Sequence, residues 1–235
     1  MMLLKRDLVN QIKSMIGTKP SVGKGFQSRK GDDGEFGRRL EESLGVEENN
    51  SQNADVPCDD GEVELKTHNV DSNCRTSVMT KEPTWNRSEG FNSIHEVVKK
   101  FATSDNDGVT RCNTTITNTP NNKGLSIDVD ETNKQVKIVD SSQTTIGSWS
   151  FKKLEDKLNQ KCGDSVIVVS RNKEGIILDA DIYSGGDFDN MKEMLRDGRM
   201  VVEIRAKTGV AKKNRGTVFR TLPKNMPDLF SGVAA

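Results

Sequence analysis

The sequence is organised around the stretch Asp59-Asp60-Gly61-Glu62-Val63-Glu64-Leu65-Lys66-Thr67. Side chains alternate along a β-strand, so the charged residues at positions 62, 64 and 66 are expected to share one face. The apolar residues at positions 63 and 65, with the threonine at 67, are expected on the opposite face, where they can pack on a core. The stretch therefore predicts a strand with one face for packing and one face for chemistry.

The charged face of this strand has the spacing D-x4-E-x-K. If Asp59 lies beside Glu64, two carboxylates about 4 Å apart repel by roughly 4 kcal/mol at an effective dielectric of about 20. A hard divalent cation relieves this repulsion, and Mg²⁺ is the natural candidate. Lys66 could then orient or deprotonate a water, or hold a phosphate, while the metal polarises a phosphodiester. The pattern indicates a metal-dependent nuclease centre, and an ordinary solvated edge strand is the alternative.

A helix is expected upstream of this strand, because Phe36, Leu40 and Leu44 recur at helical spacing. Gly37 and Glu41 lie one turn apart on one face of that helix. A glycine one turn before a carboxylate leaves room for a backbone or an ion to approach, which singles out Glu41. A solvated surface glutamate is the alternative interpretation.

The amino-acid composition excludes several classes of protein and of functional site. Lysine plus arginine and aspartate plus glutamate number 35 each in 235 residues, so any DNA-binding surface must come from local segregation of charge. The four cysteines form no C-x2-C pair and there are two histidines, which argues against a zinc knuckle, a disulfide framework or a histidine-dependent hydrolase. No stretch approaches the ~20 apolar residues of a membrane span, and no signal segment is visible. We expect a soluble, cytoplasmic protein without a membrane partner.

Hydrophobic spacing predicts further elements along the chain. Helices are expected over residues 2–16, 93–101, 149–158 and 188–195. Strands are expected over residues 75–81, 125–129, 136–139, 166–169, 176–178 and 201–205. The run at 166–169 is continuously apolar and is expected to be buried on both faces. Loops are expected over the polar stretch 104–123, and a short helix or turn over 222–230.

The most basic segment spans residues 207–220 and carries five lysines and arginines with two glycines. A basic loop of this kind can enter a DNA groove, where arginine pairs with guanine and lysine with phosphate. A solvated basic loop without a function is the alternative.

Five runs of the sequence together resemble one known family: GDDGEFGRRLEESLGVEENN, DDGEVELKTHN, TSVMTKEPTW, WSFKKLEDKL and NRGTVFR. They are similar to the MvaI/BcnI family of type II restriction endonucleases, relatives of the MutH mismatch-repair nickase. The resemblance is clearest over residues 31–85 and returns near 149–170 and 200–222. It implies an α/β (α+β) chain with the PD-(D/E)xK restriction-endonuclease-like fold, a mixed β-sheet flanked by helices.

The resemblance also implies roles for particular residues. The glutamate of the family's G-x-x-G-x-x-x-E run, which assists the centre, falls on Glu41. The metal-ligating aspartate falls on Asp59, the second carboxylate on Glu64 and the catalytic lysine on Lys66, with Mg²⁺ as the implied cofactor.

The chain departs from the family pattern at several positions. Asp59 keeps the family's spacing to Glu64, but the adjacent Asp60 is the alternative metal ligand and Asp55 lies four residues earlier. Thr80 stands where one family branch has a histidine that reads the central base pair. DNA contacts are expected from Thr80, Lys81, Arg205, Lys212, Lys213, Asn214, Arg215 and Arg220.

The leading hypothesis is a Mg²⁺-dependent type II endodeoxyribonuclease that cuts double-stranded DNA at a short specific sequence. The resemblance implies a monomer that nicks one strand at a time, with a cognate DNA methyltransferase as a candidate partner. The alternatives are a MutH-like repair nickase that depends on a partner protein, and a catalytically inactive sequence-specific DNA-binding protein. We expect one restriction-endonuclease-like unit over 1–235, with a catalytic and DNA-contacting lobe (1–110 and 200–235) and a second lobe (111–199).

Overall fold

A computed structural model describes residues 4–23, 34–46, 54–104, 110–208 and 213–233. Among these residues, no helix is both long enough and apolar enough to cross a membrane.

The chain divides into two compact units, and each unit collects segments that are distant in sequence. Unit 1 comprises residues 1–76, 158–187 and 222–235, and unit 2 comprises residues 77–157 and 188–221. The lobes expected from the sequence divide the chain at other residues, because strand pairing joins the segments near residue 60 with those near residue 170.

Unit 1 contains a five-stranded sheet in the order β1-β2-β10-β11-β14. Its strands are β1 (Val56–Cys58), β2 (Gly61–Asn69), β10 (Ser165–Arg171), β11 (Ile177–Gly186) and β14 (Phe230–Val233). β2 and β10 run parallel while the other neighbours run antiparallel, so the sheet is mixed, as predicted. The apolar run of β10 is buried on both faces, which confirms that prediction.

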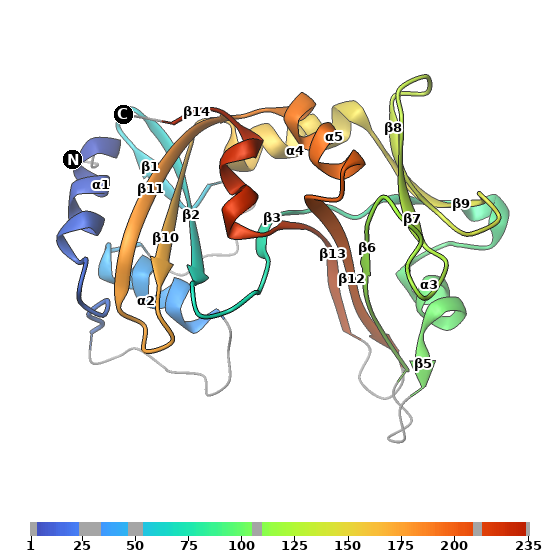
Figure 1. The fold of residues 1–235 in the computed structure, drawn as a ribbon, viewed down its shortest axis with the longest axis horizontal. Coiled ribbons are helices and arrows are strands. Elements are labelled where there is room, and N and C mark those ends of the chain that lie inside the picture. Colours follow the sequence, from blue (N-terminus) through green and yellow to red (C-terminus); the bar gives the residue numbers. More distant parts are fainter. Residues whose placement is uncertain (1–3, 24–33, 47–53, 105–109, 209–212, 234–235) are drawn as a thin grey trace. The chain divides into compact units, whose positions relative to one another are not determined.

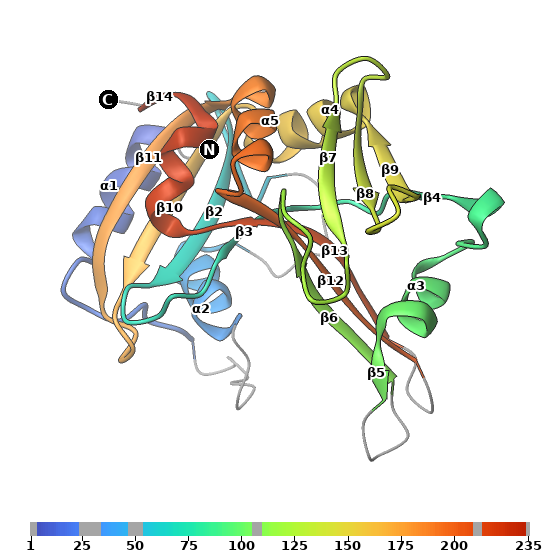
Figure 2. The same ribbon diagram turned by 45° about the vertical axis from the view of Figure 1, so that its right-hand side comes forward.

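Two helices, α1 (Lys5–Ser14) and α2 (Glu35–Ser43), lie on one face of this sheet, and the 3₁₀ segment η2 (Pro223–Leu229) lies on the other (Figures 1 and 2). Leu8 and Ile12 of α1 and Leu40 of α2 are fully buried in one cluster with Val63 and Leu65 of β2. Each such aliphatic side chain contributes roughly 1.5–3 kcal/mol when fully buried. The apolar face of β2 therefore packs under the helices, as its alternation predicted, and its charged face points away from them.

Unit 2 contains two sheets, ordered β3-β13-β12-β6-β5 and β4-β9-β8-β7. The strands of the first are β3 (Thr76–Thr80), β5 (Thr103–Ser104), β6 (Thr110–Ile116), β12 (Met200–Thr208) and β13 (Lys213–Thr221). Those of the second are β4 (Thr84–Trp85), β7 (Ser126–Asp130), β8 (Gln135–Val139) and β9 (Thr145–Ser150). The helical segments are η1 (Arg87–Glu89), α3 (Ile94–Phe101), α4 (Phe151–Cys162) and α5 (Phe188–Arg196). The boundary with unit 1 falls within α4.

The predicted helices correspond to α1 to α5. The strands predicted over 125–129 and 136–139 correspond to β7 and β8, which pair antiparallel. Two segments whose composition suggested loops contain strands. The polar stretch 104–123 contains β6, and the basic segment 207–220 contains most of β13. β6 is rich in threonine, so it lacks an apolar pattern, but it pairs along its whole length with the central strand β12. Pairing with a neighbouring strand decides the structure there.

Candidate active site

The β1–β2 hairpin determines which aspartate lies beside Glu64. Cys58 pairs with Gly61 and Val56 pairs with Val63, so positions 59 and 60 form the two-residue turn at the tip. Directly paired residues of antiparallel strands share a face. One step beyond the Val56–Val63 pair, Asp55 lies opposite Glu64. The backbone N–H of Leu65 donates to Asp55 Oδ2 over 2.9 Å and holds the carboxylate in place.

Asp59 and Asp60 are exposed at the tip of the hairpin. Asp60 Oδ1 accepts a hydrogen bond from the backbone N–H of Lys5 at the start of α1, over 2.9 Å. The expectation that Asp59, or Asp60 in its place, lies beside Glu64 is therefore wrong, because the turn carries both side chains beyond the last pair of the ladder. The structure brings Asp55, Glu64 and Lys66 together instead.

A fourth residue, Lys161 in the last turn of α4, completes the cluster. Lys161 Nζ lies 3.1 Å from Glu64 Oε2 and 4.0 Å from Asp55 Oδ1. Lys66 Nζ donates to the other oxygen of Glu64, Oε1. Glu64 is 2% exposed, so its charge is compensated by the two ammonium groups rather than by water. Sequence reasoning missed Lys161, since 97 residues separate it from Glu64.

The surroundings shift the pKa values of this cluster. Burial, followed by the negative charge of Glu64, raises the pKa of Asp55. Burial by itself would lower the pKa of Lys66, but the charge of Glu64 and its hydrogen bond outweigh burial, so the pKa of Lys66 is raised. Burial raises the pKa of the neighbouring Cys162 thiol to about 12. Lys66 is thus protonated at neutral pH, and Cys162 lines the site as a neutral thiol.

The carboxylates of this cluster fit a hard divalent cation that takes its remaining ligands from water and substrate. Within the described ranges, no group of three or more His, Cys, Asp and Glu residues is placed to hold a metal. Asp55 and Glu64 supply two carboxylates, and burial together with the negative charge of Glu64 raises the pKa of Asp55. Mg²⁺ is bound in this way, through one or two carboxylates with water and substrate phosphate as its other ligands.

Glu41 lies in α2, which packs on the opposite face of the sheet from Glu64 and Lys66. Gly37, one turn earlier, faces β2, since a Cβ built on it would lie 3.9 Å from Thr67 Oγ1. This distance is an ordinary van der Waals contact, so a larger side chain at position 37 would begin to fill the space between α2 and β2. The half-buried Glu41 follows one turn later on the same side of the helix.

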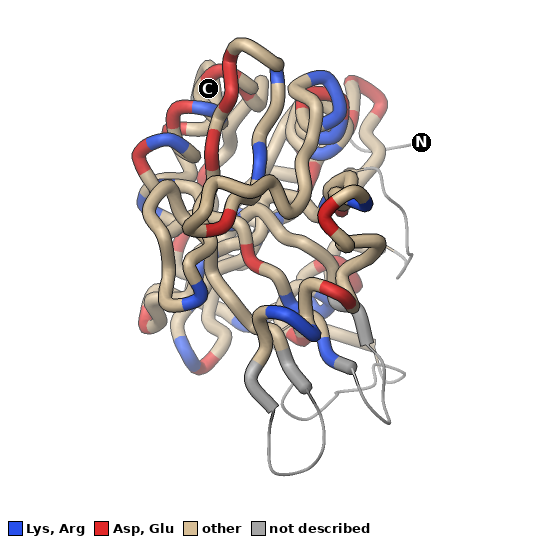
Figure 3. Tube along the Cα trace, turned by 90° about the vertical axis from the view of Figure 1, so that its right-hand side faces the viewer, with Lys and Arg blue, Asp and Glu red and all other residues tan. Residues whose placement is uncertain are grey.

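The predicted DNA contacts fall in unit 2. Thr80 is exposed at the end of β3, and the backbone N–H of Lys81 donates to Thr217 O over 3.0 Å. The guanidinium of Arg220 is in an ion pair within the protein, since its Nη1 donates to Glu203 Oε2 over 2.8 Å. Lys212 lies outside the described residues, as do the side chains of Lys213, Asn214 and Arg215. Acidic and basic residues are interspersed along the described trace in Figure 3.

A β-bulge marks the place where bases are predicted to be read. Ile204 pairs with Thr217 but Ala206 pairs with Asn214, so two residues of β13 stand opposite Arg205 of β12. One of them, Gly216, has a φ of +86°, and a Cβ there would lie 2.7 Å from Thr80 Cγ2. Bulges bend a strand and redirect its side chains. The bulge therefore explains why this position requires glycine.

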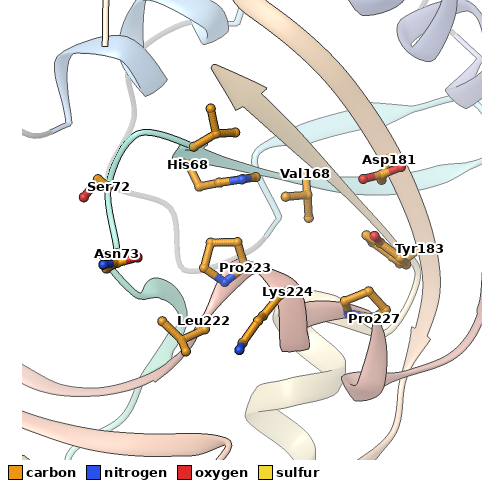
Figure 4. Close-up of a pocket in the computed structure, with 11 residues that line it drawn as sticks. His68, Ser72, Asn73, Val168, Asp181, Tyr183, Leu222, Pro223, Lys224 and Pro227 are labelled. Atoms are coloured by element: carbon orange, nitrogen blue, oxygen red, sulfur yellow. The ribbon is translucent and has the colours of Figure 1, made fainter. Parts of the chain in front are cut away.

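A cavity of about 480 Å³ in unit 1 lies on the same face of the sheet as Glu64 and Lys66. Figure 4 shows His68 and Val168 of the sheet, with Pro223, Lys224 and Pro227 of η2, around it. Burial lowers the pKa of His68, so its imidazole is neutral at pH 7. The cavity extends the open face of β2 beyond Lys66 towards η2.

Comparison with known proteins places this geometry in a family. The sequence model of the MvaI/BcnI restriction endonuclease family matches residues 19–230. A structure of restriction endonuclease MvaI in complex with its cognate DNA substrate is 20% identical, with a TM-score of 0.76 and coverage of 96% of each chain. MvaI in the absence of DNA is 18% identical, with a TM-score of 0.55 and coverage of 98% of this chain and 97% of MvaI. Comparison with curated protein sequences gives no match.

These similarities confirm the predicted restriction-endonuclease-like fold and the predicted enzyme class, a site-specific deoxyribonuclease. The family model covers the hairpin, the cluster around Glu64 and the bulge of β13. The chain belongs to the MvaI/BcnI restriction endonuclease family.

Proposed function

We propose that this protein is a Mg²⁺-dependent type II restriction endonuclease that hydrolyses phosphodiester bonds of double-stranded DNA at a short specific sequence. The observation that carries the proposal is the carboxylate pair of half-buried Asp55 and buried Glu64, with Lys66 beside them on the charged face of β2. The cognate DNA substrate in the MvaI complex supports DNA as the substrate here. The family resemblance supports a monomer that nicks one strand at a time.

Asp55 and Glu64 are the residues that would hold Mg²⁺ in this chain, and Asp55 takes the role expected of Asp59. When bound, the metal supplies a Lewis acid for the scissile phosphate and lowers the pKa of a water. Asp55 is oriented by the N–H of Leu65, and Glu64 by Lys66 and Lys161. Both carboxylates are therefore fixed before DNA arrives, which lowers the cost of assembling the site.

Lys66 acts as a cation and hydrogen-bond donor in this proposal. Its raised pKa keeps the ammonium group protonated while Glu64 is charged, so it can donate to a phosphate oxygen or orient a water. Glu41 is proposed to assist the centre from α2, as the family pattern implies. DNA contacts are proposed for Thr80, Lys81, Arg205, Lys212, Lys213, Asn214, Arg215 and Arg220.

An enzyme that cuts a short sequence would also cut the genome of its own cell. A cognate DNA methyltransferase that protects those sites is therefore proposed as the partner of this activity. Sequencing the fragment ends of a digested genome would identify both the recognition site and the cut position.

The test is incubation of supercoiled plasmid with wild-type protein and with Lys66→Ala, in Mg²⁺ and in EDTA. We expect discrete fragments from wild type in Mg²⁺ alone, and a loss of more than about a hundredfold for Lys66→Ala. Lys173→Ala is the matched control, since Lys173 is 74% exposed in the same unit. Equal cutting by wild type and Lys66→Ala would remove Lys66 from the mechanism, and no cutting of any unmodified DNA would refute the proposal.

A further inference from the structure

Lys161 stands outside the D…E-x-K pattern, yet it contacts both carboxylates of the site. Its Nζ lies 3.1 Å from Glu64 Oε2 and 4.0 Å from Asp55 Oδ1, and its side chain is 16% exposed. Helix α4 delivers it to the open face of β2, and the next residue, Cys162, is fully buried in the same place. One ammonium group thus bridges the two carboxylates that form the proposed metal site.

The charges of the cluster are already balanced. Asp55 and Glu64 contribute two negative charges, and Lys66 and Lys161 contribute two positive charges. Both oxygens of Glu64 accept hydrogen bonds from ammonium groups, Oε1 from Lys66 and Oε2 from Lys161. A divalent cation added beside Lys161 would bring two further positive charges within a few ångströms of an ammonium group in a poorly solvated site. The two cations therefore compete for the same oxygens.

We propose that Lys161 is a placeholder for the divalent cation: in the DNA-free protein its ammonium group holds Asp55 and Glu64 together, and it withdraws when metal binds. This inference rests on the proposed function, because it takes these two carboxylates as the metal ligands. The ammonium group of Lys161 offsets the repulsion between the two carboxylates while the site is without metal. It also weakens metal binding in the absence of DNA.

The inference couples metal capture to the substrate. A DNA phosphodiester brings one negative charge to the site, and this charge can accept the ammonium group that leaves Glu64. The affinity for metal should therefore rise when duplex is bound, and it should rise more for wild type than for a protein without the lysine. Lys161 is a positioning residue in this scheme, since it acts through the carboxylates.

The experiment measures Mn²⁺ binding to the DNA-free protein from the electron paramagnetic resonance signal of free Mn²⁺. Lys161→Met, which keeps the length of the side chain without its charge, is expected to bind Mn²⁺ about tenfold or more tightly than wild type, because a like charge within ~4 Å has been removed. Lys161→Arg keeps the charge and should bind no more tightly than wild type. Lys152→Met is the matched control, since Lys152 lies on the same helix, is 81% exposed and pairs with Asp156.

Equal or weaker Mn²⁺ binding by Lys161→Met, including no measurable binding by either protein, would overturn the placeholder. Circular dichroism checks the fold, and Lys161→Gln, whose amide can still donate to Glu64, repeats the test if the methionine variant is unfolded. Adding Asp55→Asn to Lys161→Met should abolish the gain in affinity. Wild type that cuts plasmid while Lys161→Met shows no gain would refute the placeholder alone, whereas a gain in a protein that cuts no DNA would refute the nuclease alone.

Discussion

Asp55 and Asp59 belong to the same β1–β2 hairpin, but their surroundings differ. Asp55 is held by the N–H of Leu65 opposite Glu64, with Lys161 Nζ 4.0 Å away. Asp59 is exposed in the two-residue turn at the tip of the same hairpin. The spacing of Asp59 to Glu64 equals that expected of a metal-ligating pair, whereas Asp55 has the required position in space.

The difference shows that the register of the hairpin, rather than distance along the chain, decides which carboxylates meet. The two carboxylates at the tip are exposed to water, and that of Asp60 accepts a hydrogen bond from the backbone N–H of Lys5, so neither needs a metal for compensation. A carboxylate in the ladder loses water and faces another negative charge. That unfavourable pair is what a divalent cation would relieve.

The largest expected effect comes from two single substitutions, Asp55→Asn and Asp59→Asn, which compare the two aspartates directly. Asp55→Asn should lower Mg²⁺-dependent plasmid cleavage by more than about a hundredfold, because a metal contributes several kcal/mol to the transition state. Asp59→Asn, an exposed surface change, should stay within about twofold of wild type. The melting temperature of Asp55→Asn should equal or exceed that of wild type, since the substitution removes a repelled charge. The reverse order of activities would show that the turn aspartate is the ligand.

A smaller effect, on stability, is expected from a substitution at Gly61, which directly follows the turn. Gly61 has a φ of +132°, and a Cβ there would lie 1.9 Å from Asp164 Oδ2. Gly61→Ala should therefore lower the free energy of unfolding by about 1–3 kcal/mol, measured by thermal unfolding. Gly17→Ala is the matched control, because Gly17 also has a positive φ, +84°, but has no atom within 4 Å of the added Cβ. If both variants lose equal stability, the contact with Asp164 has no role in holding the register.

The smallest effect concerns Asp164, which ties the hairpin to α1. Asp164 Oδ2 accepts from the N–H of Glu62 over 2.7 Å, and Oδ1 accepts from Lys5 Nζ. Burial by itself would raise the pKa of Asp164, but these hydrogen bonds outweigh burial and lower it. A lowered carboxyl pKa stabilises the fold above the unfolded value near 4 and is lost as the pH falls through the folded pKa.

Asp164→Asn should thus lower the melting temperature by about 1–3 °C at pH 7, as expected of a partly exposed pair in a chain of this size. The difference from wild type should shrink as the pH falls below the unfolded value near 4, and it should vanish once the pH is below the lowered pKa of the native carboxylate. Asp156→Asn serves as the control, since Asp156 is 60% exposed and pairs only across one turn of α4 with Lys152 in the described contacts. A deficit that stays constant from pH 7 to pH 3 would show that charge has no part in it.

Much of the fold could be predicted from local pattern. The helical spacing of Leu8 and Ile12, the alternation around Val63 and the apolar run of β10 all correspond to elements in the structure. Threonine-rich β6 could not be predicted in this way, because its strand conformation comes from pairing with β12. The same holds for β13, whose basic residues suggested a loop.

The candidate site was predicted in part. Glu64 and Lys66 lie on one strand face, as alternation requires, and they are in contact. Asp55 could have been found by placing the two-residue turn at Asp59-Asp60 and counting the pairs back from Cys58 and Gly61. Lys161 could not be found, because only the parallel pairing of β2 with β10 brings the end of α4 to Glu64.

The chain passes between the two units four times, at residues 76/77, 157/158, 187/188 and 221/222. Neither unit is therefore a continuous segment that recombination could replace as a cassette. Along the sequence, the strands that carry the proposed base-reading residues alternate with the segments that build the catalytic sheet. New target sequences in such a chain would have to arise by substitutions within it, at positions such as Thr80 and the bulge around Gly216, and not by exchange of a recognition domain.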